Sequence, residues 1–292
     1  MRKVVVLRKP VTRNRGGFAT KSMGLGQRRE ASINSENLSP REEAELVRDP
    51  EVVAFAPVMP TQLIRPLAAE SGAGAAWGVG AVGADVSAFD GSGVIVAVLD
   101  TGIDVAHPAF KGVKLDQRDF TGAGMADVQG HGTHCAGVIF GRDIAGQRIG
   151  IARGVRRALI GKVLGDDGSG DSEMVFDALH WATSNGANVI SMSLGFDFPG
   201  LVDDLCQQGW PTKLATSTAL EAYRANLLMF NAIMAELKAK RAFGKDVLVV
   251  AAAGNESERT VDPKFVIAAS LPSAAEDVLS VAAVGRSDAG LA

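Results

Sequence analysis

The chain has 292 residues, of which 47% are hydrophobic and 22% are charged, so it can bury a sizeable core and disorder is excluded for most of it. This length predicts one large domain or two smaller ones. Two cysteines, Cys135 and Cys206, cannot build a disulfide framework. The apolar run at 4–7 is too short for a signal peptide, and no apolar run is long enough to cross a bilayer. We therefore expect no membrane partner and, by default, a cytoplasmic location.

The charge of the chain is divided unevenly. Residues 1–66 hold 12 Lys and Arg against 7 Asp and Glu, whereas residues 67–292 hold 18 against 26. A basic arm is typical of proteins that contact nucleic acid, but no interleaved aromatic residues or groove-reading motif accompany this one. Because the rest of the same chain is acidic, we expect residues 1–66 to bind their own chain, and we expect no nucleic-acid partner.

The first part of the chain has the pattern of a small α+β unit. The apolar runs at 4–7 and 52–56 are typical of strands, and Ser39-Pro40 followed by acidic residues is typical of a helix start. Residues 13–35 are polar and weakly patterned, which indicates a mobile segment. Three prolines then mark a linker: Pro57, Pro60 and Pro66. We expect a satellite domain over residues 1–66.

The remainder, residues 67–292, alternates short apolar runs with helical stretches. The runs are near-continuously apolar, as strands buried on both faces should be, and occupy 94–99, 158–164, 188–193, 247–252 and 278–284. Helices are expected at 132–140, 171–185 and 218–243. The last has an apolar stripe that indicates a packing face: Leu220, Tyr223, Leu227, Phe230, Met234 and Leu237. This alternation predicts an α/β fold with a parallel sheet covered on both sides.

Three polar residues stand at the ends of predicted strands or at the start of a predicted helix. Asp100 ends the first strand of the body, His131 stands between two glycines at a helix start, and Asn255 follows a strand. Each has an ordinary structural interpretation: a turn carboxylate, a packed histidine and a turn amide. A zinc site from His131, His134 and Cys135 is another alternative, but no second pair of ligands with suitable spacing exists.

A nucleotide-binding fingerprint is the rival from another functional class. Residues 78–83 match G-x-G-x-x-G, a pattern that needs a strand before it and a helix after it. Here a Gly/Ala-rich segment precedes the glycines and a strand follows them, so we do not favour a dinucleotide site.

Four motifs together resemble those of the subtilisin-like serine peptidases, the subtilase family. They lie at 100–104, 131–134, 191–195 and 252–255, in the order and strand context of that family. The resemblance implies a three-layer subtilisin-like fold and a serine-type endopeptidase that acts on peptide or protein substrates. Residues 1–66 resemble a short form of the family's inhibitory propeptide.

The resemblance also implies roles for individual residues. Asp100 would orient the imidazole, His131 would act as general base and acid, and Asn255 would donate to the oxyanion. An extended substrate would pair with the backbone of two edge segments and would also contact residues beside Asn255. The substrate-binding residues implied are Gly168, Ser169, Gly170, Ser193, Leu194, Gly195, Ala253 and Gly254.

The sequence departs from the family pattern in one main respect. The Gly-Thr-Ser-Met-Ala-like segment that carries the nucleophilic serine is not found up to Ala292. We expect residues 1–292 to be inactive alone, with the serine in a further segment or in a second polypeptide. The alternative is a catalytically inactive relative that binds peptides or a partner.

Two smaller departures concern metal binding and an insertion. Ala109 stands where many relatives place a calcium-binding Asp, so the sequence predicts no cofactor or metal, although calcium is not excluded. Residues 196–245 are longer than the usual family connection and have no assigned role. Cys135 is interpreted as a small buried residue rather than a reactive thiol.

Overall fold

The computed structural model describes residues 1–10, 31–65, 76–241, 244, 246–259, 261–284, 286–287 and 290–291. Its centre is a six-stranded sheet in which every neighbouring pair is parallel, in the order β12-β11-β9-β5-β7-β6. The strands are β5 (Ile95–Asp100), β6 (Lys114–Asp119), β7 (Arg157–Lys162), β9 (Val189–Met192), β11 (Leu248–Ala252) and β12 (Val278–Val281). The parallel sheet expected from the apolar runs is confirmed.

The two edge strands differ from the sequence expectations. β6 was not predicted, because its sequence Lys-Leu-Asp-Gln-Arg-Asp has one apolar residue and reads as a loop. A charged edge strand is a common protection against edge-to-edge pairing. β12 was expected to be buried on both faces, yet Leu279 is 50% and Val281 49% exposed. The expectation of burial on both faces is therefore wrong for β12.

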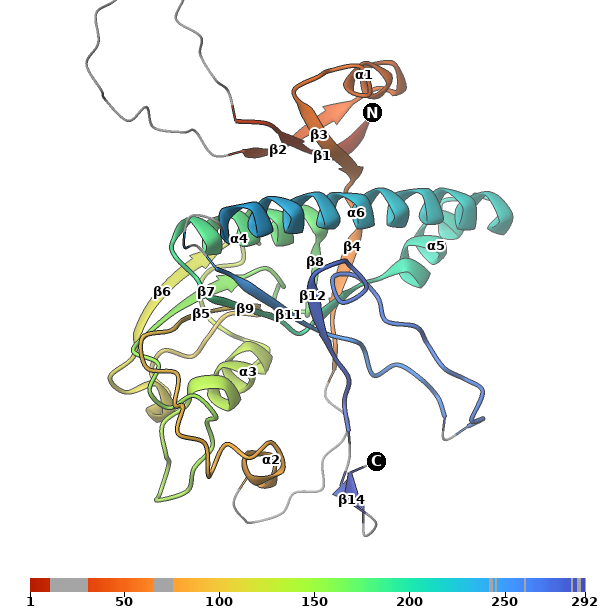
Figure 1. Ribbon diagram of the computed structural model, residues 1–292. Coiled ribbons are helices and arrows are strands. Elements are labelled where there is room, and N and C mark those ends of the chain that lie inside the picture. The colour runs from red at the N-terminus through yellow and green to blue at the C-terminus, as the bar shows by residue number, and fades with distance from the viewer. Residues whose placement is uncertain are drawn as a thin grey trace, which may run out of the picture.

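Helices cover both faces of the sheet and complete three layers (Figure 1). On one face α3 (His131–Phe140) packs Phe140 against Val96 and Val98. On the other face α4 (Ser172–Ser184) and α6 (Thr212–Arg241) contribute to a core with Ala97 and Leu99. Successive residues of β5 thus point to opposite layers, as pleating requires. The three-layer α/β fold is confirmed.

The connection over residues 196–245 forms two helices. α5 (Phe198–Gln207) was not predicted, and α6 begins six residues earlier than expected. The buried stripe of α6 also differs from the predicted one, since Leu220 is 49% exposed. Phe230, Met234 and Leu237 of the predicted stripe are buried. The buried stripe also contains residues that were not predicted, the first of them small: Ala215, Ala219, Ala222, Asn226, Met229 and Ile233.

Residues 1–10 and 31–57 form an α+β unit, drawn above α6 in Figure 1. A three-stranded antiparallel sheet, order β2-β1-β3, contains β1 (Arg2–Arg8), β2 (Ser32–Leu38) and β3 (Val52–Pro57). α1 (Pro40–Leu46) is capped by Ser39, whose side chain forms a capping box with Glu42.

The expectation of a mobile segment at 13–35 is wrong for residues 32–35, which lie in β2. A polar strand such as Ser-Ile-Asn-Ser-Glu-Asn-Leu carries little apolar pattern to reveal it. Residues 13–30 and Pro66 lie outside the described residues.

The sheet of this unit packs on both of its faces. Val4 and Val6 face α1 in a small cluster with Leu46. Val5 and Leu7 face the body and join the same buried cluster as Phe176 of α4 and Phe230 of α6, so apolar burial continues from the unit into the body.

The remaining elements are short. They are β4 (Pro60–Leu63), β8 (Ser169–Asp171), β10 (Leu194–Phe196), β13 (Arg286–Ser287), β14 (Gly290–Leu291), α2 (Trp77–Ala81) and a 3₁₀ turn at Pro108–Phe110. Within the described part of the chain, no helix has both the length and the apolar character needed to span a bilayer.

Candidate active site

Asp100 is the last residue of β5 and lies at the carboxyl edge of the sheet. Its side chain is 1% exposed. Oδ1 accepts a hydrogen bond from the backbone N–H of Thr101 at 2.7 Å. Oδ2 is buried with no hydrogen-bond partner among the described residues. A carboxylate buried this deeply is costly unless a cationic or donating group lies beside it.

His131 supplies that group. It is the first residue of α3, and its Nδ1 lies 2.8 Å from Asp100 Oδ1, with 8% of its side chain exposed. Because the carboxylate engages Nδ1, Nε2 is left as the proton-accepting atom. The helix start can approach β5 this closely because residue 132 is glycine: a Cβ there would lie 2.2 Å from the Gly102 carbonyl oxygen.

Cys135 lies one turn further along α3, beside the same ring. Its Sγ is 3.7 Å from Nδ1 and 3.8 Å from Nε2 of His131. Burial disfavours the imidazolium, but the hydrogen bonds and charges of Asp100 and Cys135 outweigh this effect and raise the pKa of His131 from 6.5 to about 10. Potential metal-ligating atoms of Asp100, His131 and Cys135 lie within 4.8 Å of one another, although the Asp–His geometry is that of a hydrogen-bonded pair.

A strand from the N-terminal part of the chain lies beside this pair. β4 pairs antiparallel with β10 on one side and with β8 on the other, giving a second sheet of order β10-β4-β8. Figure 1 labels β4 and β8. Two further backbone bonds extend the pairing, from Leu63 N to Gly168 O at 2.9 Å and from Ile64 N to Ser193 O at 3.2 Å. Pro60 was expected in a linker, and this expectation is wrong, because the residue begins a paired strand.

Glycines line this added strand, and at Gly170 a side chain would be obstructed. A Cβ at Gly170 would lie 3.0 Å from Thr61 Oγ1 and 2.3 Å from the Val163 carbonyl oxygen. Gly195 lies under the side chain of Ile64, whose nearest atoms would be 3.8 Å from a Cβ there. The structure thus places six of the sequence-predicted substrate-binding residues around one peptide strand: Gly168, Ser169, Gly170, Ser193, Leu194 and Gly195.

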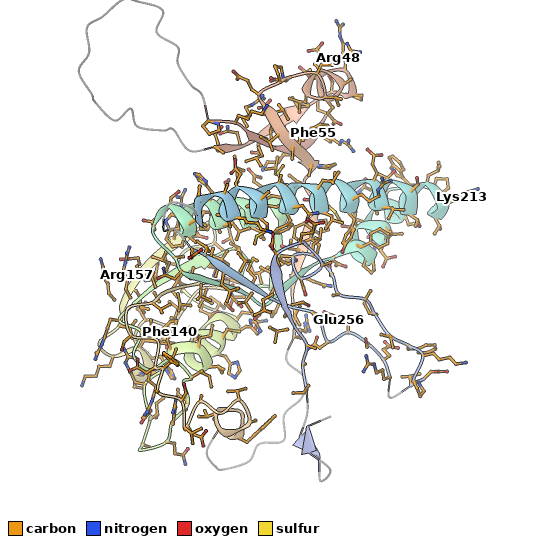
Figure 2. The ribbon with its side chains drawn as sticks, viewed as in Figure 1. Arg48, Phe55, Phe140, Arg157, Lys213 and Glu256 are labelled. Atoms are coloured by element: carbon orange, nitrogen blue, oxygen red, sulfur yellow. The ribbon has the colours of Figure 1, made fainter. Side chains whose placement is uncertain are left out.

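Asn255 lies beyond the end of β11 and contacts the chain that follows β4. Its Nδ2 donates to the carbonyl oxygen of Arg65. Its backbone N–H donates to Glu256 Oε2 at 2.8 Å, and Figure 2 labels this glutamate. Gly254, before it, has φ +106°, a conformation that favours glycine. An amide that donates to a peptide carbonyl is the group an oxyanion site requires.

The other sequence-predicted positions lie as follows. Ala253 donates its N–H to the Val281 carbonyl at 2.8 Å and continues the pairing of β11 with β12. Ala109 is fully buried in an apolar cluster with Phe110 and Phe140, the second of which is labelled in Figure 2. Its methyl group offers no ligand for a cation.

Comparison with protein families agrees with this geometry. The model of the subtilase family matches residues 91–292. The chain belongs to the subtilase family. This match covers the strands and helices that position Asp100, His131 and Asn255.

Named relatives are similar over part of their length. The Major intracellular serine protease of Bacillus subtilis is 30% identical over 205 residues, which are 66% of this chain and 52% of the relative. Subtilisin-like protease 2 of Pseudogymnoascus destructans is 38% identical over 140 residues, 44% of this chain and 34% of the relative. Alkaline serine exoprotease A of Vibrio alginolyticus is 40% identical over 112 residues, which are 37% of this chain and 20% of the relative. The chain thus spans about half the length of the first relative and less of the other two.

Two features of the site were not identified from the sequence. The strand β4 was missed because three prolines in ten residues indicate a linker and its partners β8 and β10 have only three residues each. Asp127 was missed as well, although it accepts hydrogen bonds from the segments that carry Asp100 and His131. An acidic residue four positions before a histidine that opens a helix was the available signal.

Proposed function

We propose that this protein is a serine-type endopeptidase that hydrolyses peptide bonds with an Asp-His-Ser triad, of which residues 1–292 supply Asp100 and His131. The observation that carries the proposal is the 2.8 Å contact between Asp100 Oδ1 and His131 Nδ1 at the carboxyl edge of the sheet. Membership of the subtilase family supports it.

The proposed chemistry combines the Asp100–His131 pair and Asn255 with a serine from outside residues 1–292. A serine hydroxyl attacks the substrate carbonyl carbon while His131 Nε2 accepts its proton, and Asp100 stabilises the imidazolium. Asn255 Nδ2 donates to the oxygen that becomes negative. His131 then gives the proton to the leaving amine, and a water molecule repeats the cycle on the acyl-enzyme.

Substrate recognition is proposed to follow the pattern of β4. An extended peptide would pair antiparallel with 168–170 and 193–195, and backbone pairing of this kind supplies affinity without demanding a particular sequence. Residues 1–65 then act as a substrate-like inhibitor of their own chain, because β4 already occupies both edges.

The serine itself is proposed to lie outside residues 1–292, either later in the same polypeptide or in a second one. The partial coverage of the named relatives supports this part of the proposal. The nucleotide sequence after codon 292 distinguishes the two sources, since an in-frame Gly-Thr-Ser-Met segment identifies the first.

The test of activity uses the complete encoded protein. We expect a fluorescent phosphonofluoridate to label one serine, and we expect hydrolysis of casein, with both lost in His131→Ala. Absence of labelling and hydrolysis after removal of residues 1–65 by limited proteolysis contradicts the proposal.

A peptide-binding protein without catalysis is the second candidate, and the paired strand β4 favours it independently of any serine. The two candidates differ in the effect of His131→Ala. This substitution leaves binding of a peptide with the sequence of residues 60–65 intact in both cases, but it removes hydrolysis only from an enzyme.

A cytoplasmic location belongs to the same proposal. The Bacillus subtilis relative is named an intracellular protease, and this supports the extension to the present chain. Fractionation of the source cells checks it, with the protein expected in the cytosolic fraction.

A further inference from the structure

Asp127 lies between the two segments that carry Asp100 and His131. Its Oδ1 accepts hydrogen bonds from the Thr101 hydroxyl and from the Gly130 N–H, both at 2.8 Å. Its Oδ2 accepts from the Thr133 N–H at 2.8 Å and from the Thr133 hydroxyl at 2.6 Å. One carboxylate therefore holds the residue that follows Asp100 and residues on either side of His131.

Two threonine hydroxyls extend this arrangement. The Thr101 hydroxyl donates to Asp127 and accepts from the Gly132 N–H at 2.9 Å. The Thr133 hydroxyl donates to Asp127 and accepts from the Asp104 N–H at 2.8 Å. A hydroxyl has one proton, so committing it to the carboxylate fixes the direction of both bridges. The turn after β5 is thus linked to the first turn of α3 in both directions.

The charge of Asp127 suits this position. α3 begins after Gly130, which has no side chain to cap the free N–H groups of the first turn, and Asp127 caps the Thr133 N–H instead. Burial opposes ionisation, but the bonds from Thr133, Thr101 and Gly130 outweigh it and lower the pKa of Asp127. The ionised carboxylate also lies at the positive end of the α3 dipole.

We propose that Asp127 is a positioning residue for the Asp100–His131 pair: its carboxylate fixes the turn after β5 against the start of α3 and thereby sets the contact between the two catalytic side chains. Asp127 makes none of its four bonds to the imidazole or to the Asp100 carboxylate. The description of the pair as catalytic rests on the proposed peptidase function. The effect of Asp127 on the contact between Asp100 and His131 can be measured without hydrolysis.

The pKa of His131 is the readout, because it depends on the hydrogen bond to Asp100. Loss of the Asp127 charge also lowers this pKa, and the Thr101 variants, which keep the carboxylate, separate the two effects. The titratable groups against the imidazole are Asp100, from β5, and Cys135, from α3 itself. The experiment follows the ring signals of ¹³C-labelled histidine in the complete encoded protein, with His131 assigned by His131→Gln. We expect Asp127→Ala to lower the pKa of His131 by about one unit or more, and Asp127→Asn by less, because one oxygen acceptor remains.

Asp119 provides a matched control. Its carboxylate also accepts from a threonine and from loop N–H groups, those of Thr121 and Gly124, and β7 separates its strand from that of Asp100. We expect Asp119→Ala to lower the melting temperature without changing the pKa of His131. An unchanged His131 pKa in both Asp127 variants, with a similar loss of thermal stability, overturns the proposal and leaves Asp127 a structural cap.

Thr101 keeps the test decisive if Asp127→Ala does not fold. Thr101→Ser retains the bridging hydroxyl and should leave the His131 pKa unchanged, whereas Thr101→Val removes the hydroxyl at nearly equal volume and should lower it. Equal pKa values in the two variants overturn the proposal. Absence of hydrolysis in the complete protein contradicts the proposed function but does not affect these titrations.

Discussion

The imidazole of His131 is subject to opposing influences. Burial disfavours its charged form, while Asp100 on one side and the Cys135 sulfur on the other favour it, with a net rise in pKa. A general base must be neutral before it can accept a proton. In the proposed peptidase, activity should therefore increase with pH above the ordinary histidine range.

Cys135→Ala tests the contribution of the thiol. We expect a lower His131 pKa by ¹³C titration, and in the complete protein an acid limb of kcat/KM that moves to lower pH. Cys206→Ala is the control, because Cys206 bonds to Thr212 far along the chain from His131. Equal His131 pKa values in the two cysteine variants would count against a role for Cys135.

The same pKa predicts the pH dependence of folding. A group whose pKa is raised on folding stabilises the native state fully below its unfolded value, here 6.5, and the effect is lost as pH rises through about 10. We expect the free energy of unfolding of the wild type to fall between these values more steeply than that of His131→Gln. Urea titrations from pH 6 to pH 10 measure it, and parallel curves would refute it.

Gly170 tests the close approach of β4. A Cβ there meets the Val163 carbonyl and Thr61, so we expect Gly170→Ala to destabilise the protein by about 1–3 kcal/mol, as overpacking does, and to increase amide exchange in 60–63. Gly137→Ala, in α3, is the control, since nothing lies within 4 Å of its Cβ. Exchange that is unchanged in 60–63 would contradict the prediction.

At the scale of elements, α6 holds the N-terminal unit through polar as well as apolar contacts. Asn226 is fully buried, and its Nδ2 donates to the Pro57 carbonyl at the end of β3 at 2.8 Å. Arg2 lies 3.6 Å from Glu221 of α6, and Lys3 pairs with Glu173 of α4. The acidic body expected to attract residues 1–66 thus contributes two ion pairs, although the larger contact is apolar.

Asn226→Ala should weaken this contact. We expect a loss of about 1–3 kcal/mol, because the Pro57 carbonyl loses its buried donor, and faster amide exchange in β1 and β3 than in β5. Asn231→Ala, on the same helix, is the control, since Asn231 accepts from the Glu276 N–H on the body. Faster exchange in β5 and β3 alike would indicate a general loss of packing instead.

The sequence predicts the central elements better than the peripheral ones for physical reasons. β5, β7, β9 and β11 are short, apolar and paired on both sides, so their composition reveals them. β6 is a charged edge, and β8 and β10 exist as strands only because β4 lies between them. Asp100 and His131 could be predicted from motifs that share one sheet edge, whereas the role of Asp127 depends on contacts between two loops.

At the scale of the whole molecule, several large apolar side chains between residues 265 and 284 are exposed. Leu279, Val281 and Val284 are each about half exposed, at 50%, 49% and 55%, as are Phe265 and Ile267, at 51% and 58%. Exposed apolar surface of this kind is a liability for association.

We expect residues 1–292, expressed alone, to bind a hydrophobic dye and to self-associate, and Leu279→Lys to reduce both several-fold. Val86→Lys is the control, because Val86 is 85% exposed and lies in the connection between α2 and β5. Light scattering and dye fluorescence provide the measurement. A monomer that melts cooperatively and binds no dye would contradict the prediction and favour a self-sufficient binding protein.

In the proposed peptidase, an external peptide that binds between 168–170 and 193–195 must compete with β4, which is tethered to the same chain. A ligand attached by a short chain is present at its site at an effective concentration in the millimolar range. A free peptide of equal intrinsic affinity must therefore reach about that concentration to displace β4 while the chain between residues 65 and 76 is intact. After a single cut in that connection, rebinding of β4 to β8 and β10 changes from a first-order to a second-order process. The extent of rebinding then depends on protein concentration.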